Sequence, residues 1–303
     1  MELVTDTSAP CLTTGSHPGR ATLRWVEGCF GEGAEVRMVR PLPGGSAHAN
    51  HALLVETRSG SAHRLVLRRW TQGPFPPADR SPEREIAALA LLSGSSLPTP
   101  TLVAADPAGA YCDAPALLIT RLVGHPPRPS PDDLPEYLIQ LAAALLSVHG
   151  LAGASTMPPY VPYNRLDQCA VPRHARRPAL WERAFEIASG APPESPSRFI
   201  HRDYHPDNTL WSYGRLTGIV DWSDASYGPP GVDIAHMRLN LALRYGPTAA
   251  ERFTAAFDQV SGGYPHDPYW DLRCLLDLLP ETEDHTLDEA TVPLLEDYLR
   301  TLL

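Results

Sequence analysis

The sequence predicts an α+β protein with two lobes, of which the first is rich in strands and the second is mostly helical. Apolar runs of strand length dominate residues 1–122, with one prominent helix among them. Residues 123–303 show mainly the apolar spacing that is typical of helices. The breaker cluster 123–127, with the sequence VGHPP, separates the two parts. We therefore expect one domain over 1–122 and another over 123–303.

In the first domain the pattern of apolar residues predicts strands and two helices. The main helix is expected to begin after Ser81, because Pro82 suits the first helical position and Glu85 lies in the acidic first turns. Strands are expected at 35–40, 51–57, 63–70, 102–106 and 116–122, and helices at 21–33 and 81–92.

The second domain is expected to hold most of the helices. Leucines and valine recur at helical spacing over 133–149 and are interpreted as core. Residues 151–180 read as irregular, and one strand is expected at 216–220. The other helices are expected at 181–189, 232–244, 248–260, 269–279 and 287–303.

Composition excludes several classes of protein. The net charge is −10, so the chain lacks the basic footprint of a nucleic-acid binder. Five cysteines without a C-x-x-C pair indicate reduced thiols rather than a disulfide framework or a zinc ribbon. The first residues show no secretory signal, and the longest apolar stretch, 138–152, is too short to span a bilayer. We expect a cytoplasmic protein, monomeric or homodimeric, that binds neither membrane nor nucleic acid.

The stretch 201–208, with the sequence HRDYHPDN, carries the strongest chemical signal. Asp203 suits a base that orients an acceptor hydroxyl and takes its proton. Asn208 and Asp221, the second of these at the end of a strand, suit oxygen ligands of Mg²⁺. A base, an amide and a carboxylate at this spacing are what phosphoryl transfer from a nucleotide requires.

An alternative for the same stretch is a metal trio of His201, Asp203 and His205 on one strand face, as in a zinc site. That alternative leaves Asn208 and Asp221 without a role. His201 then has a simpler interpretation, namely packing under the loop and hydrogen-bonding to it.

Two further features of the first domain suit a nucleotide. The small residues of 43–50 would let backbone N–H groups approach phosphates, although an ordinary hairpin turn explains them equally well. Arg68 and Arg69 end a strand, where they are either solvated or directed at phosphates. Glu85 lies seventeen residues after Arg68, and an Arg68–Glu85 ion pair would join the strand to the helix.

These motifs resemble the aminoglycoside phosphotransferase and choline kinase family, a branch of the protein-kinase-like fold. The resemblance rests on 201–208, on Gly218–Trp222 and on the GPPGVDIA stretch 228–235, and 115–124 is similar to the family's hinge. It covers most of the chain. It implies a nucleotide-binding N-lobe of sheet plus helix, a helical C-lobe with catalytic loop and substrate site, and ATP or GTP in the cleft.

The resemblance also implies roles for individual residues. Asp203 would be the catalytic base, and Asn208 and Asp221 the Mg²⁺ ligands. Asp233 would brace the catalytic loop. The nucleotide would be bound by Ser46, His48 and Asn50 over the phosphates, by Arg68 with Glu85 on the upstream phosphates, and by the backbone of Thr120 and Leu122 at the adenine.

The sequence departs from the family pattern at several positions. The strand cation is Arg rather than Lys, and the planar guanidinium of Arg binds a phosphate with a different geometry. Arg68 and Arg69 both remain candidates for this cation. The nucleotide loop lacks a full G-x-G-x-x-G. Position 202 is Arg where many small-molecule kinases carry Gly. No Ala-Pro-Glu follows Asp221, which disfavours a protein kinase.

Three functions are compared on this basis. The first is a kinase for a small hydroxylated substrate: an aminoglycoside-like antibiotic, which would confer antibiotic resistance, or a metabolite of the choline, homoserine or sugar type. The second is a catalytically silent nucleotide-binding module, disfavoured by the joint presence of Asp203, Asn208 and Asp221. The third is a protein kinase.

Acceptor contacts stay open at this point. Asp271 and the acidic stretch 281–284 would either line a cationic substrate site or be solvated, and Tyr269 and Trp270 would either stack on a substrate or belong to the core. Asp224 would either join the metal's outer shell or lie at the surface.

Overall fold

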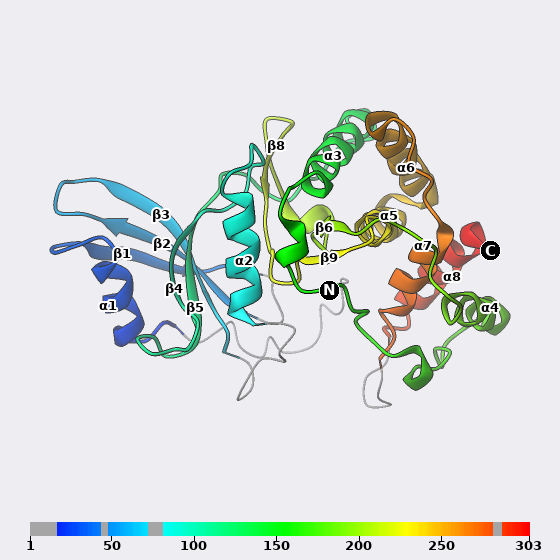
Figure 1. Ribbon diagram of the computed structural model, residues 1–303, viewed down its shortest axis with the longest axis horizontal. Coiled ribbons are helices and arrows are strands. Elements are labelled where there is room, and N and C mark those ends of the chain that lie inside the picture. The colour runs from blue at the N-terminus through cyan, green and yellow to red at the C-terminus, as the bar shows by residue number, and fades with distance from the viewer. Residues whose placement is uncertain (1–16, 44–47, 72–80, 281–286) are drawn as a thin grey trace. The chain divides into compact units, whose positions relative to one another are not determined.

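The computed structural model describes residues 17–43, 48–71, 81–280 and 287–303, and these form two compact units (Figure 1). The strand-rich unit contains the described residues up to Val123 together with Gly218–Asp224. The helical unit contains Gly124–Thr217 and the described residues of Ala225–Leu303. The domain boundary between 122 and 123 stays a prediction. The sequence did not indicate that Gly218–Asp224 belongs to the strand-rich unit.

The strand-rich unit is built on a five-stranded sheet in the order β1-β2-β3-β5-β4, with antiparallel neighbours throughout. The β2–β3 hairpin sets the register that matters for the site, because it pairs Asn50 with Arg68 and Ala49 with Arg69. The elements are α1 (Arg20–Gly28), β1 (Glu35–Pro41), β2 (Ala49–Glu56), β3 (Ala62–Arg69), α2 (Pro82–Leu92), β4 (Leu102–Asp106) and β5 (Ala116–Thr120).

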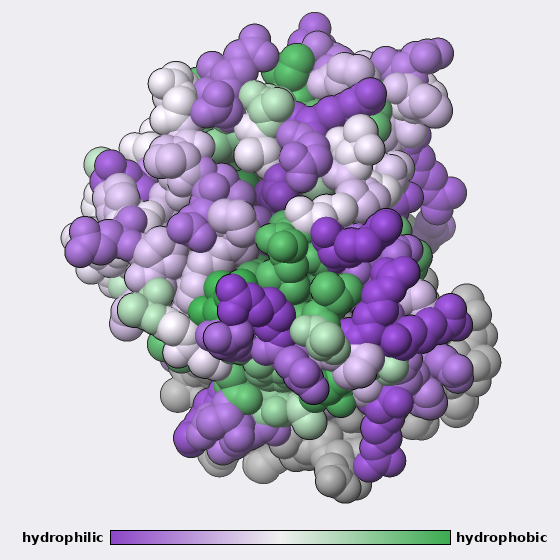
Figure 2. Space-filling model, turned by 90° about the vertical axis from the view of Figure 1, so that its right-hand side faces the viewer, coloured by the Kyte–Doolittle hydropathy of each residue, from purple (hydrophilic) through white to green (hydrophobic). Residues whose placement is uncertain are grey.

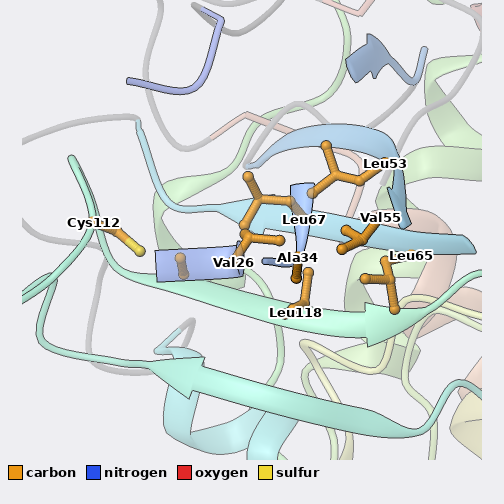
Figure 3. Close-up of a cluster of buried hydrophobic side chains, with 9 residues drawn as sticks. Val26, Ala34, Leu53, Val55, Leu65, Leu67, Cys112 and Leu118 are labelled. Carbon is orange, nitrogen blue, oxygen red and sulfur yellow. The ribbon is translucent and has the colours of Figure 1, made fainter. Parts of the chain in front are cut away.

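The core of this unit lies between α1 and the sheet (Figure 3). Val26 of α1 is fully buried and faces apolar side chains that alternate along β2, β3 and β5. The partners that close the cluster are Ala34, Leu53, Val55, Leu65, Leu67, Cys112, Ala116 and Leu118. Burial of these alternating residues fixes the register of the sheet, since a slip by one residue would turn every one of them outward.

The helical unit is organised around α5, whose residues Gly231–Ala242 are all buried. Helices α6 and α7 pack on α5, and α3 packs on α6. Besides α5 (Gly231–Tyr245), the helices are α3 (Leu134–His149), α4 (Pro178–Ala188), α6 (Pro247–Ser261), α7 (Pro268–Leu276) and α8 (Thr291–Leu302). Two short antiparallel pairs lie among them: β6 (Arg198–Ile200) with β9 (Ser226–Gly228), and β7 (Thr209–Ser212) with β8 (Arg215–Ile219).

The outer helices are amphipathic. Helix α8 buries Val292, Leu295 and Leu299 and leaves Leu294 half exposed. Figure 2 views the side on which α8 lies and shows a mainly hydrophilic surface with a hydrophobic area near its centre. Within the described part of the chain, no helix combines the length and apolar character needed to cross a bilayer.

The expected elements are all found, with shifted ends. Helices α4, α6 and α7 begin earlier than expected because Pro178, Pro247 and Pro268 occupy their first turns, where a missing N–H costs nothing. The expected helix at 21–33 ends at Gly28, and the one at 269–279 ends at Leu276. The model confirms the α+β class, with the strands concentrated in one unit and the helices in the other.

Two glycines of the segment 228–231 are required by close approach of aromatic rings. A Cβ on Gly228 would lie 2.5 Å from Cβ of Tyr160, and one on Gly231 would lie 2.4 Å from the indole ring of Trp270. Neither ring is a flexible chain end that could move aside cheaply. The segment therefore owes its glycines to the packing of Tyr160 and Trp270 rather than to backbone freedom.

We predict that Gly231→Ala lowers the free energy of unfolding by about 1–3 kcal/mol, as overpacking of a filled core does. Gly150→Ala is the matched control, since its new Cβ would meet atoms only at 3.5 Å and beyond. That variant should be unchanged or more stable by up to about 1 kcal/mol. Urea denaturation of both proteins measures the difference, and equal midpoints would contradict the close approach at Trp270.

Candidate active site

The loop 201–208 connects β6 to β7 and is buried along most of its length. The side chain of Tyr204 reaches into the helical core, where its hydroxyl donates to the carbonyl oxygen of Leu141 at 2.9 Å. His201 is fully buried, and its Nδ1 accepts from the N–H of Asp203 at 3.3 Å. This confirms the interpretation of His201 as a residue that packs under the loop and hydrogen-bonds to it.

Asp233, near the start of α5, holds the beginning of the loop. Its carboxylate accepts from the backbone N–H of His201 at 2.9 Å and from that of Arg202 at 2.7 Å. Nε2 of His149, the last residue of α3, lies 3.0 Å from the same carboxylate. Asp233 is fully buried, so the bracing role expected for it is confirmed.

Asp203 lies with two histidines in a buried pocket of polar atoms. Nε2 of His205 is 3.5 Å from Oδ2 and Nε2 of His236 is 3.1 Å from Oδ1. Burial by itself would raise the pKa of Asp203, but the two histidines lower it, and the net pKa lies well below its usual range. The carboxylate is therefore ionised at neutral pH.

One oxygen of Asp203 is placed to receive a proton. Oδ1 is buried and, although Nε2 of His236 lies 3.1 Å away, no hydrogen bond satisfies this oxygen among the described residues. Oδ2, in contrast, accepts from Nδ2 of Asn208 at 2.9 Å. An ionised carboxylate with one oxygen fixed and the other unsatisfied is what a general base requires.

Asn208 is oriented by the loop itself. Its amide nitrogen donates to both the backbone oxygen and the carboxylate of Asp203, each at 2.9 Å. Since the nitrogen faces Asp203, the amide oxygen is the atom left for a cation. The donor set of an amide oxygen with a carboxylate suits Mg²⁺, which prefers oxygen ligands.

The metal trio His201, Asp203 and His205 does not form. Ligand atoms of Asp203, His205 and His236 instead lie within 4.8 Å of one another, and His201 is held elsewhere by its bond to the Asp203 N–H. His236 comes from α5, thirty-three residues after Asp203. Alternation along a presumed strand therefore selected the wrong histidine, because the loop is not extended at Arg202, where φ is +69°.

The strand-rich unit contains its own polar cluster. Nη1 of Arg68 donates to both carboxylate oxygens of Glu85, at 3.0 and 2.9 Å, which confirms the expected ion pair. The same nitrogen lies 2.7 Å from Oδ1 of Asp221. Burial raises the pKa of Glu85 to about 7, Arg68 opposes that rise, and Asp221 adds to it. Arg68 thus joins the sheet, α2 and the segment that follows β8.

Asp221 lies in a left-handed conformation with φ of +66°. Asp tolerates this region better than most residues. Besides Arg68, its Oδ1 accepts from Oγ of Ser223 at 3.0 Å. Asp224 belongs to the same unit, and its charge also raises the pKa of Glu85.

The two strand-end arginines have different partners. Arg69 points to the other face of the sheet, where its Nη1 lies 2.6 Å from Oδ2 of Asp113. That carboxylate also accepts from Thr22 and from the N–H of Gly19, so Arg69 anchors the start of α1. Arg68 is the arginine that reaches Glu85 and Asp221.

The expected nucleotide loop is only partly described. Ser46 lies outside the described residues. Asn50 does not face outward, because its Oδ1 accepts from Nε of Arg68 at 3.1 Å across the β2–β3 pair. His48 is buried and packs edge-on against Trp70, with ring centroids 4.7 Å apart. The side chains of Asn50 and His48 thus position Arg68 and the sheet end, and their contact with phosphates stays a prediction.

The expected hinge lies at the end of β5. The N–H of Thr120 donates to the carbonyl oxygen of Thr101 at 3.0 Å. An adenine contact at Thr120 would consequently use its carbonyl oxygen, and a donor would have to come from Leu122, just beyond the strand.

Asp271 is neither solvated nor open to a substrate, and Trp270 follows the core alternative. Asp271 is fully buried, bonded to Nε of Arg238 at 2.8 Å and to the Tyr298 hydroxyl at 2.7 Å, so it cannot line an open cationic site. Trp270 is buried at 6% exposure. The acidic stretch 281–284 lies outside the described residues.

Sequence reasoning missed His236, His149 and the placement of Arg202. His236 follows directly after the motif 228–235, and its spacing of three residues from Asp233 puts both on the same face of α5. That spacing was the available signal. The sequence contains no comparable signal for His149 or for the placement of Arg202, because their partners are distant in sequence.

Comparisons with known proteins identify the family and the fold. The model of the phosphotransferase enzyme family matches residues 39–270. No curated protein sequence matches. A Ralstonia eutropha protein assigned to the aminoglycoside phosphotransferases has a TM-score of 0.64 at 13% identity, covering 93% of this chain and 97% of that one.

Two further solved structures show the same fold. A mutant aminoglycoside phosphotransferase in ternary complex with ADP and hygromycin B has a TM-score of 0.63 at 18% identity, covering 93% and 98% of the two chains. A macrolide 2'-phosphotransferase of type I has 0.58 at 16% identity, covering 94% and 97%. At these identities the likenesses show the fold alone.

We predict that Arg68→Met reduces phosphoryl transfer at least about a hundredfold, as removal of a preorganised charge does. It should also destabilise the fold by about 3–5 kcal/mol, because Glu85 is left buried without a partner. The double variant Arg68→Met/Glu85→Met removes that unpaired charge, so it should recover stability without recovering activity. Steady-state kinetics and urea denaturation measure the two effects.

Arg69→Met is the matched control. Its partner Asp113 is partly exposed and keeps its bonds to Thr22 and Gly19, so activity should stay within about threefold of wild type. If Arg69→Met lost transfer and Arg68→Met kept it, the assignment of the two arginines would be reversed.

Proposed function

The chain belongs to the phosphotransferase enzyme family, and from that premise we propose that it transfers the γ-phosphoryl group of ATP or GTP to a small molecule in a Mg²⁺-dependent reaction. It is a small-molecule phosphotransferase that acts on hydroxyl groups. The family alone does not identify the acceptor, which could be a sugar, an amino alcohol or an aminoglycoside-like antibiotic.

The observation that carries the proposal is the environment of Asp203. The carboxylate is ionised, one oxygen is held by Asn208, and the other is buried and unsatisfied among the described residues. An acceptor hydroxyl donating to Oδ1 would be oriented for attack on the γ-phosphorus. Asp203 would take its proton as the new phosphoester bond forms.

The remaining residues bind and position. Arg68, held by Glu85 and Asn50, would bind phosphate oxygens of the nucleotide. Asn208 and Asp221 would be the Mg²⁺ ligands, and the bound ion would neutralise charge on the β- and γ-phosphates. The donor's adenine or guanine would contact the backbone at Thr120 and Leu122.

We expect Asp203→Asn to lower kcat by about a hundred- to ten-thousandfold, the usual contribution of a positioned base. The measurement is Mg²⁺-dependent nucleotide consumption with a broad panel of hydroxyl acceptors, with the fold checked by circular dichroism. Wild type and variant that are equally inert across the panel would show the proposed enzyme function to be wrong.

The second expectation concerns the metal. Chelation should abolish turnover and added Mg²⁺ should restore it. Asp221→Asn should need at least about tenfold more Mg²⁺, because a neutral amide is a weaker ligand than a carboxylate. Asn is chosen since it also tolerates the left-handed backbone at this position. An unchanged Mg²⁺ requirement would remove Asp221 from the ligand set.

A further inference from the structure

A small cavity lies beside the proposed base within the helical unit. Its volume is about 10 Å³, and its lining includes Tyr160, Tyr163, Arg202, His236, Trp270 and Asp277. His236 connects the cavity to the base, since its Nε2 is 3.1 Å from Oδ1 of Asp203. A space of this size holds about one water molecule or one oxygen atom of a ligand.

The shape of the cavity is built into the backbone. Gly228 and Gly231 have no room for a Cβ because Tyr160 and Trp270, both lining residues, press against them. The two glycines therefore let the aromatic walls approach the catalytic loop.

Arg202 is the unusual member of the lining. Its residue exposure is 3%, and its guanidinium lies over the rings of Tyr163 and Tyr160, at 4.2 and 5.4 Å from their centroids. Its Nη2 donates to the carbonyl oxygen of Val161 at 2.5 Å. Its Nε is buried and, within the described residues, has no hydrogen-bond partner. The backbone of Arg202 has φ of +69°, a conformation that residues other than glycine rarely adopt.

Among the described residues the charge of Arg202 has no ion-pair partner in direct contact, although Asp277 across the cavity attracts it at longer range. Among the described residues no carboxylate lies within 4.0 Å of its guanidinium nitrogens. The carboxylate across the cavity, Asp277, has its Oδ1 engaged by Arg273 at 3.0 Å and by the N–H groups of Tyr163 and Asn164. Burial raises the pKa of Asp277 to about 6, against the lowering effect of Arg273.

His236, another titratable side chain of the lining, adds no negative charge. Burial lowers the pKa of His236, and its contact with Asp203 only partly opposes that shift, so the imidazole is neutral at pH 7. A buried guanidinium without a carboxylate in direct contact and with an unsatisfied N–H is costly. It gains most from an anionic oxygen that enters the cavity.

We propose that this cavity is a specificity site, in which Arg202 binds a carboxylate of the acceptor, and that the substrate is a hydroxylated carboxylic acid rather than a cationic aminoglycoside or amino alcohol. This inference rests on the proposed function for the hydroxyl that Asp203 activates. The carboxylate oxygen would accept from Nε of Arg202 while the hydroxyl of the same molecule donates to Asp203.

The same arrangement disfavours an ammonium group. An ammonium ion in the cavity would be repelled by the charge of Arg202. The faces of Tyr160 and Tyr163, which could attract an ammonium ion, are already in contact with the guanidinium. It would also have to compete with Arg273 for Asp277.

The test uses two matched series of acceptors: glycerate, glycerol and serinol, and gluconate, glucose and glucosamine. Binding of each is measured by calorimetry on the Asp203→Asn chain, and phosphorylation on the wild type. In at least one series the acid should bind and react about ten- to hundredfold better than the neutral compound, as a hydrogen bond to a charged group provides, and the amine should be the poorest.

Substitution of Arg202 must then remove the discrimination. Arg202→Met should erase the preference for the acid, and Arg202→Lys should keep part of it, because the charge stays while the planar donor is lost. Arg183→Met is the control, since that exposed arginine of α4 pairs with Glu186 away from the cavity, and it should leave the ratio unchanged.

The outcomes separate the two proposals. Acids that bind through Arg202 but are never phosphorylated would contradict the proposed function and support the specificity site. Phosphorylation of serinol or glucosamine at least as fast as of the matched acid would overturn the specificity site and keep the function. Equal acid preference in wild type and Arg202→Met, or no binding by any acid, would overturn it too.

Discussion

The carboxylate of Asp233 is the constraint on which the catalytic loop depends. It is fully buried, and it accepts from two consecutive backbone N–H groups at the entrance of the loop and faces His149 of α3. A buried carboxylate without donors would be expensive, so the loop N–H groups and Asp233 stabilise each other. Because α5 itself is buried by its neighbours, the position of the loop is set by the packing of the whole helical unit.

That constraint has a consequence for Arg202. Presenting two successive N–H groups to one carboxylate turns the backbone, and Arg202 takes φ of +69°. Glycine meets this demand without strain, which is a physical reason for the glycine that many small-molecule kinases carry at this place. An arginine here bears the strain and also brings a guanidinium to the cavity that His236 shares with Asp203. The arginine at position 202, where the family pattern has glycine, thus lies at the proposed acceptor site.

Much of the fold was predictable because it follows from local pattern. Alternating apolar residues on 51–57 and 63–70 and helical spacing on 133–149 identify β2, β3 and α3, and the loop 201–208 was recognised by residue type and spacing. The family match confirms the resemblance, and the Arg68–Glu85 pair confirms a contact between strand and helix.

What could not be predicted depends on distant partners and on backbone turns. The sequence does not reveal that Asn50 faces Arg68 rather than a ligand, because this follows from hairpin register. Nor does it show that His236 replaces His201 beside Asp203, since that depends on a positive φ. Helix α7 turns both Asp271 and Trp270 into the core, which contradicts both alternatives for Asp271 and confirms the core alternative for Trp270.

The buried arginines show why Arg202 stands apart. Arg68, Arg69, Arg238 and Arg273 each have a carboxylate oxygen within 3.0 Å, at 2.7, 2.6, 2.8 and 3.0 Å. Each joins elements that would otherwise separate, so the cost of burying the charge is offset by a matched partner. Arg202 is as deeply buried, yet its contacts are one carbonyl oxygen and two aromatic rings, and Asp277 acts on its charge only across the cavity. Its unsatisfied Nε leaves this guanidinium available to a partner that arrives with the substrate.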